Sequence, residues 1–145
     1  MRYLLDVNVL VALFDAAHPN HEPAHAWFGD VAQRAWASCP ITENGLVRVL
    51  SHPRYPSVHA AAAEVAERLN ELCAGTRHER WPCDGTLLDA GVFSLHHVAG
   101  PGQLTDVYLL GLALRHGGQL ATFDRRIPVA AVPHGGRGGL ALIPA

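Results

Sequence analysis

The sequence predicts an α/β fold of three layers, in which a mostly parallel sheet is flanked by helices on both faces. Short apolar runs alternate with longer helical stretches along the 145 residues, as in proteins built from strand–helix–strand units. Several of the apolar runs end at an acidic residue, which is typical of strands whose carboxyl ends face a ligand site. No repeat or linker interrupts the pattern, so we expect a single domain over residues 1–145.

Two strands and four helices are expected in the first half of the chain. The strands are the apolar runs 3–5, which ends at Asp6, and 36–39. Thr42 is expected to cap the third helix, which places Glu43 in a first turn where the helix dipole favours a negative charge. The four helices are expected at 7–17, 23–35, 43–50 and 60–74.

The second half predicts three further strands and one helix. Pro82 disfavours a central place in a sheet, so the run 80–83 is expected at an edge. Thr105 is expected to cap a helix over 106–116, which the glycines at 117–118 end. The last two strands are expected at 119–123 and 140–143.

The composition limits the classes of function. With no apolar stretch near the roughly 18 residues of a membrane span and no export signal, we expect a cytoplasmic protein without membrane contact. The three cysteines form no close-spaced pair and are expected to be reduced. The net charge of −2 argues against a broad basic surface. It does not exclude nucleic acid, because a bound metal changes the charge that a phosphate meets.

Four acidic residues lie where apolar runs begin or end: Asp6, Glu43, Asp106 and Asp124. Acids gathered at one edge of a sheet repel one another, and a hard divalent cation holds them together most easily. Cleavage of a phosphodiester needs charge stabilisation and an activated water, which Mg²⁺ or Mn²⁺ supplies. Asp6 and Asp106 are the first candidates for metal ligands. Glu43 and Asp124 are expected to bind through water, complete a second site or act as general base.

A plainer interpretation explains part of this pattern. Glu43 and Asp106 each follow a threonine, as ordinary first-turn acids do, and Asp124 suits a surface turn. It does not explain Asp6, because an acid after a buried strand is costly unless it has a partner. The histidines 18, 21 and 25 suggest zinc, but no acid or cysteine of suitable spacing completes a site, so surface histidines are expected.

Taken together, the motifs resemble those of PIN-domain ribonucleases, and more closely of VapC toxins from VapBC toxin–antitoxin pairs. The matching stretches, in order, are LDVNVL at 5–10, CPITENGLVRVL at 39–50, LTDVYLL at 104–110 and LATFDRR at 120–126. The resemblance implies a Mg²⁺-dependent endoribonuclease, with Mn²⁺ as a substitute. Its catalytic acids would match Asp6, Glu43, Asp106 and Asp124, and its metal ligands would match Asp6 and Asp106, together with Asp124.

The resemblance also implies supporting residues and partners. Asn8 and Thr122 would orient the carboxylates. The expected substrate is a structured RNA such as a tRNA or rRNA, cleaved by metal-activated water, and the expected partners are a VapB-type antitoxin and a second copy in a homodimer. Among the arginines, the planar fork suits phosphate oxygens, so Arg48, Arg125 and Arg126 are candidates for RNA contact.

Two other functions compete with this one. A HAD-like phosphohydrolase also has an aspartate after its first strand, but it needs a second acid two residues later, where this chain has Asn8. A catalytically silent PIN-like module would act only by binding antitoxin or RNA. The presence of all four acids favours the enzyme.

Overall fold

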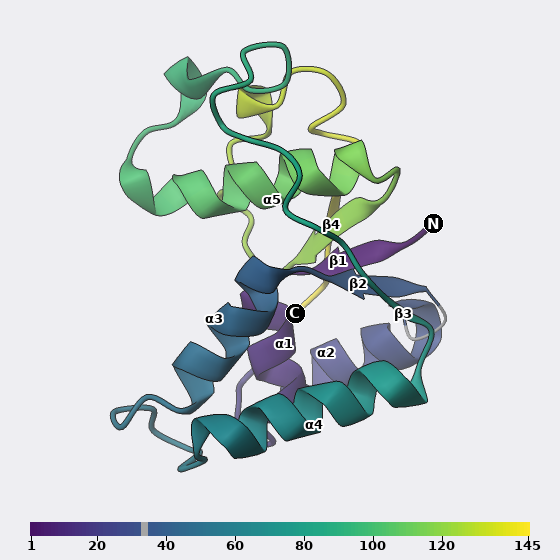
Figure 1. The fold of residues 1–145 in the computed structure, drawn as a ribbon, viewed down its shortest axis with the longest axis vertical. Helices are drawn as coiled ribbons and strands as arrows, with labels where there is room; N and C mark the ends of the chain where they lie inside the picture. The colour runs from purple at the N-terminus through teal and green to yellow at the C-terminus, as the bar shows by residue number, and fades with distance from the viewer. Residues whose placement is uncertain (33–34) are drawn as a thin grey trace.

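The computed structural model describes residues 1–32 and 35–145, and its centre is a five-stranded sheet in which all paired strands are parallel (Figure 1). The strands lie in the order β3-β2-β1-β4-β5, so the strand order reverses between β1 and β4. In open parallel sheets, ligands bind beside the carboxyl ends of the strands at such a reversal. The strands are β1 (Tyr3–Leu5), β2 (Trp36–Ser38), β3 (His78–Arg80), β4 (Gln119–Thr122) and β5 (Leu140–Leu142).

Helices cover both faces of this sheet (Figure 1). One face carries α1 (Val7–Phe14), α2 (His21–Trp27), α3 (Pro40–Leu50) and α4 (Ala62–Gly75), and the other carries α5 (Leu104–Arg115). The predicted three-layer α/β/α arrangement is therefore confirmed. Shorter elements complete the chain: a π-helical turn at Phe28–Ala32 and 3₁₀ turns at Leu95–His97, Pro101–Gln103 and Val129–Ala131.

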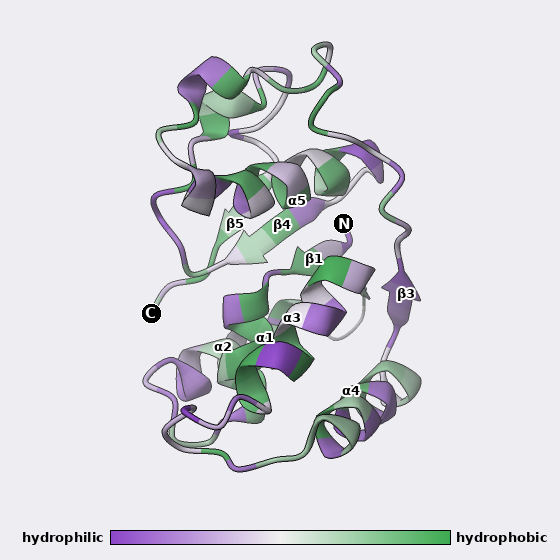
Figure 2. Ribbon diagram, turned by 60° about the vertical axis from the view of Figure 1, so that its left-hand side comes forward, coloured by the Kyte–Doolittle hydropathy of each residue, from purple (hydrophilic) through white to green (hydrophobic). Residues whose placement is uncertain are grey.

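Two apolar cores lie on opposite faces of the sheet. Successive residues of a strand point to opposite faces, and in β1 the side chain of Leu5 joins the core under α1 to α4 while Leu4 joins the core under α5. Both leucines are fully buried. Figure 2 shows that β3, by contrast, is hydrophilic along its length, as suits a strand at the edge of the sheet. The predicted edge position of this strand is confirmed.

A close contact between α1 and α3 joins the first two strand–helix units. A Cβ added at Gly45 would lie 2.6 Å from Cγ2 of Val7, so the absence of a side chain lets the two helices approach. Val7 directly follows Asp6, and Gly45 comes two residues after Glu43. The contact therefore brings the starts of α1 and α3, which carry these two acids, toward the same edge of the sheet.

The structure corrects both predicted N-caps. The third helix begins at Pro40 with Cys39 as its N-cap, and Thr42 lies inside it, where its Oγ1 accepts a hydrogen bond from Cys39 N. Proline is well suited to the first helical position because its φ is preset and it needs no donor there. Similarly, α5 begins at Leu104, one residue before Thr105, because the preceding 3₁₀ turn leads directly into the helix.

Other boundaries differ by two or three residues. The first helix ends at Phe14 rather than at residue 17, because Asp15 adopts an extended backbone and its carboxylate accepts hydrogen bonds from Ala17 N and Tyr55 Oη. The helix expected at 23–35 starts at His21, and its residues 33–34 lie outside the described residues. The edge strand ends at Arg80, where the prediction began it.

Across 1–32 and 35–145, no helix combines the length and the apolar character needed to cross a bilayer.

Candidate functional site

Asp6 lies at the sheet reversal, directly after β1 and at the N-cap of α1. Its side chain is 4% exposed. Oδ1 accepts a hydrogen bond of 2.8 Å from Val7 N, and Oδ2 accepts one of 2.8 Å from Thr122 Oγ1. Burial raises the pKa of Asp6, and the negative charge of Asp124 adds to this rise against the two hydrogen bonds. The protein therefore holds Asp6 firmly but offsets its charge only in part.

Asn8 and Thr122 fix the surroundings of this carboxylate. Oδ1 of Asn8 accepts a hydrogen bond of 3.2 Å from Phe123 N, which leaves Nδ2 to donate to Thr122 Oγ1 over 3.0 Å. The same hydroxyl accepts a hydrogen bond of 3.0 Å from Asp124 N. One buried threonine at the end of β4 thus connects Asp6, Asn8 and the backbone of Asp124.

Asp106 brings a third carboxylate from the first turn of α5. Burial, followed by the charges of Asp6 and Asp124, raises the pKa of Asp106 to about 6, against a lowering effect of Arg126. Within the described part of the chain, no group donates a hydrogen bond to the Asp106 carboxylate. Asp124 itself accepts hydrogen bonds from N and Nε of Arg126, whose side chain is 89% exposed. An exposed arginine offsets little of the charge of three carboxylates.

These three aspartates have the chemistry that a hard divalent cation requires. They offer only oxygen donors, and their mutual repulsion falls when a cation binds between them. They do not form a complete cage: over residues 1–32 and 35–145, no three His, Cys, Asp or Glu side chains are arranged to hold one ion. Mg²⁺ keeps several waters and needs only one or two direct carboxylates. The residues therefore fit a Mg²⁺ ion held partly through water.

Glu43 has other partners. Its Oε2 accepts a hydrogen bond of 2.6 Å from Ser38 Oγ and one of 2.8 Å from Arg80 Nε. The carboxylates that raise the pKa of Asp106 are Asp6 and Asp124, without Glu43. The structure thus brings three of the four predicted acids into one electrostatic group and places the fourth in a paired cluster beside it.

Ser38, His78 and Arg80 were not among the residues predicted from the sequence. Ser38 and Arg80 are the last residues of β2 and β3 and stand opposite each other in the parallel register. Both therefore lie at the carboxyl edge, where ligand sites form. The prediction began the edge strand at Arg80 instead of ending it there, which moved this arginine to the wrong end of the sheet. A strand placed two residues earlier would have revealed it.

The three candidate arginines lie in two places. Arg125 and Arg126 are exposed and line a shallow pocket of about 420 Å³ together with Asn8 and Asp124. Arg48 lies near the end of α3 and lines a different pocket of about 310 Å³ next to Tyr55. Only the first pair lies beside the aspartates.

The histidines that suggested zinc contact the backbone instead. A ring nitrogen of His21 lies 2.8 Å from the carbonyl oxygen of Ala12, and one of His25 lies 3.1 Å from that of Leu13. These carbonyls belong to the last turn of α1, whose carbonyl oxygens lack helical partners. The two histidines therefore satisfy the end of a helix, which is a structural role.

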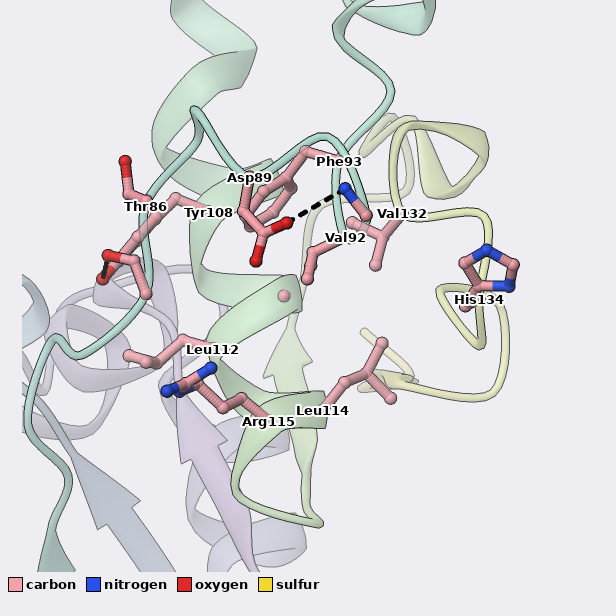
Figure 3. A pocket seen from close by; sticks show the side chains of 13 residues that line it. Thr86, Asp89, Val92, Phe93, Tyr108, Leu112, Leu114, Arg115, Val132 and His134 are labelled. Atoms are coloured by element: carbon pink, nitrogen blue, oxygen red, sulfur yellow. Dashed lines mark hydrogen bonds between the residues drawn. The ribbon is translucent and has the colours of Figure 1, made fainter.

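A further pocket of about 250 Å³ lies against α5 and under the chain segment that follows β3 (Figure 3). Most of its lining is apolar, including Phe93, Leu112 and Val132. Asp89 is turned to its own loop and accepts a hydrogen bond of 2.9 Å from Gly91 N. None of the four candidate acids lines this pocket, so it is separate from the site described above.

Comparisons with known proteins identify the family of this chain. The PIN domain family profile matches residues 3–133. Ribonuclease VapC44 of Mycobacterium tuberculosis (strain ATCC 25618 / H37Rv) is 48% identical over 136 residues, which is 92% of this chain and 93% of the relative. From the same strain, Ribonuclease VapC39 is 36% identical over 90% of this chain and 94% of its own length. Ribonuclease VapC29 is 43% identical over 86% of each.

Proposed function

The chain belongs to the PIN-domain family, within its VapC branch, and on this premise we propose that it is the toxin of a type II toxin–antitoxin system, acting as a metal-dependent endoribonuclease. The observation that carries the proposal is the group of Asp6, Asp106 and Asp124 at the sheet reversal. Three like charges gathered at one edge of the sheet repel one another, which a bound cation relieves, and cleavage of a phosphodiester needs a cation to offset charge.

In the proposed mechanism, Asp6, Asp106 and Asp124 hold Mg²⁺, with Mn²⁺ as a substitute. A divalent ion held by these residues would supply an activated water and would offset the charge that develops on the phosphate. Thr122 and Asn8 keep the Asp6 carboxylate in one orientation through the hydrogen bonds between them. Burial of Asp6 keeps competing water away from that carboxylate, which strengthens its attraction for a cation. Glu43 completes the set of catalytic acids.

The exposed Arg125 and Arg126 lie beside this site, and we propose that they bind phosphates of the RNA next to the scissile bond. Arg48 would contact the RNA further along. We propose a structured RNA such as a tRNA or rRNA as substrate, a VapB-type antitoxin as inhibitor, and a homodimer of single-domain chains acting in the cytoplasm.

The proposal is tested with purified protein and structured RNA. We expect cleavage in Mg²⁺ that stops on chelation and leaves a 5′-phosphate and a 3′-hydroxyl. Asp6→Asn keeps the size of the side chain and one of its two acceptor oxygens but removes its charge, so cleavage and growth arrest on expression should both be lost. Asp30→Asn, at an exposed position, is the matched control.

Two results would contradict the proposal. RNA left intact in both Mg²⁺ and Mn²⁺ would favour the silent binding module. A 2′,3′-cyclic phosphate product would show attack by the ribose hydroxyl instead of by metal-activated water.

A further inference from the structure

Glu43 lies in a cluster of four residues at the carboxyl edge of β2 and β3, together with Ser38, His78 and Arg80. Ser38 Oγ lies 2.6 Å from Glu43 Oε2 and 2.7 Å from His78 Nε2. Arg80 Nε lies 2.8 Å from the same Glu43 oxygen. The cluster therefore fixes one oxygen of the carboxylate from two directions.

The direction of these hydrogen bonds follows from the number of protons. Ser38 has one hydroxyl proton, and an ionised carboxylate can only accept, so Ser38 donates to Glu43. His78 must then donate from Nε2 to the Ser38 oxygen, which makes its proton-bearing nitrogen Nε2. Ser38 is fully buried, and its hydroxyl has a hydrogen-bond partner both as donor and as acceptor. The hydroxyl is thus held in a single orientation, aimed at Glu43.

Only one of the two Glu43 oxygens is occupied. Over the described residues, both hydrogen bonds to this carboxylate go to Oε2, and none goes to Oε1. An exposed ion pair adds at most about 1 kcal/mol to the stability of a protein, so an exposed pair alone would give this carboxylate little structural value. Here the paired glutamate side chain is 16% exposed and receives a buried hydroxyl as well as an arginine.

The cluster lies next to the aspartates. Leu4 pairs with Ala37, so the end of β1 that leads into Asp6 runs beside the end of β2 that holds Ser38. The contact of Gly45 with Val7 brings the start of α3 against the start of α1. A fixed Glu43 is therefore held at the border of the site on the β2 side.

We propose that Arg80 and Ser38 are positioning residues, which hold Glu43 by Oε2 so that Oε1 is free to serve the cleavage of RNA. The inference rests on the proposed function. It assigns Arg80 to Glu43 rather than to the RNA, although an exposed arginine near an RNA site would ordinarily suggest a phosphate contact. It also gives the buried Ser38 hydroxyl a functional role, which is to hold Glu43 Oε2.

The test measures kcat and KM for RNA cleavage separately. Arg80→Gln should lower kcat by about ten- to hundredfold, as is usual when the support of a catalytic group is removed, and should leave KM unchanged. Arg80→Lys retains a donor and should recover part of kcat. Ser38→Ala should likewise lower kcat. Arg77→Gln removes an equal charge from an exposed position before β3 and should change neither constant.

A double-mutant cycle shows whether Arg80 acts through Glu43. In a Glu43→Gln background, Arg80→Gln should cause no further loss of kcat, because the carboxylate that Arg80 positions is already gone. Equal losses in both backgrounds, or a raised KM with unchanged kcat, would overturn the inference and make Arg80 an RNA contact. The wild-type chain and Asp6→Asn are run together with these variants. Intact RNA with the wild type overturns the proposed function and this inference, whereas an active wild type with unaffected Arg80→Gln overturns this inference alone.

Discussion

Two groups of acids lie at the carboxyl edge of the same sheet and differ in how their charge is compensated. On the β1–β4 side, the charge of Asp124 helps to raise the pKa of Asp6, and the charges of Asp6 and Asp124 help to raise that of Asp106, against a lowering effect of Arg126. On the β2–β3 side, Glu43 is paired with Arg80 and with the Ser38 hydroxyl. The protein's own residues compensate the charge of the second group, whereas under the proposed function a cation would compensate that of the first. The same type of side chain at the same edge thus serves two purposes.

The largest expected difference between the two groups is in catalysis. Asp106→Asn should lower RNA cleavage by about a thousandfold or more, since the interaction of a metal with the reacting phosphate is worth several kcal/mol. Glu43→Gln should lower it by about ten- to hundredfold, because Gln retains the oxygen that Ser38 and Arg80 hold. Single-turnover rates at saturating Mg²⁺ measure both, with Glu64→Gln on the exposed start of α4 as control. A greater loss from Glu43→Gln would reverse the ranking of the two groups.

A second comparison concerns the free energy of unfolding. Thr122→Val should lower it by about 2 kcal/mol, because the buried Asp6 loses its hydroxyl donor and Asn8 loses its acceptor. Arg80→Gln should lower it by less than about 1 kcal/mol, because the arginine side chain is 58% exposed. Urea titrations measure both values. Thr105→Val, at an exposed position of α5, should stay within about 0.5 kcal/mol of the wild type. A Thr122→Val variant as stable as that control would show that the buried hydroxyl is dispensable.

The smallest effect depends on pH and on metal. The pKa of Asp106 in the folded chain, about 6, lies above its ordinary value of 3.8, so ionising it costs stability as the pH rises between these values. Asp106→Asn should therefore stabilise the metal-free protein by about 1 kcal/mol at about pH 7.5, after allowance for solvent screening. The gain should vanish below about pH 4, where the carboxyl is protonated in both states.

Added Mg²⁺ tests whether charge repulsion at Asp106 causes this difference in stability. At about pH 7.5, Mg²⁺ should raise the melting temperature of the wild type and should raise that of Asp106→Asn much less, because binding to the folded state alone stabilises it. A gain for Asp106→Asn that persists unchanged at low pH would show that charge repulsion is not its cause.

The fold class was predictable because strand and helix periodicities are local. The runs at β1, β2, β4 and β5 end within one residue of their expected positions. The N-caps could not be predicted in this way. Pro40 and the 3₁₀ turn before α5 start their helices earlier than the threonines suggested. Capping preferences are worth about 1 kcal/mol, and neighbouring backbone geometry overrides them easily.

The sequence by itself determined the order of strands and helices, the acids after the strands, and the resemblance of their motifs to one family. It could not show how the acids divide. That depends on the strand order, which places Asp6 and Asp124 at one reversal, and on the register of β2 and β3, which sets Arg80 opposite Ser38. These residues are separated by 42 positions or more along the chain. Their pairing arises only from the long-range packing of the sheet, which no local pattern encodes.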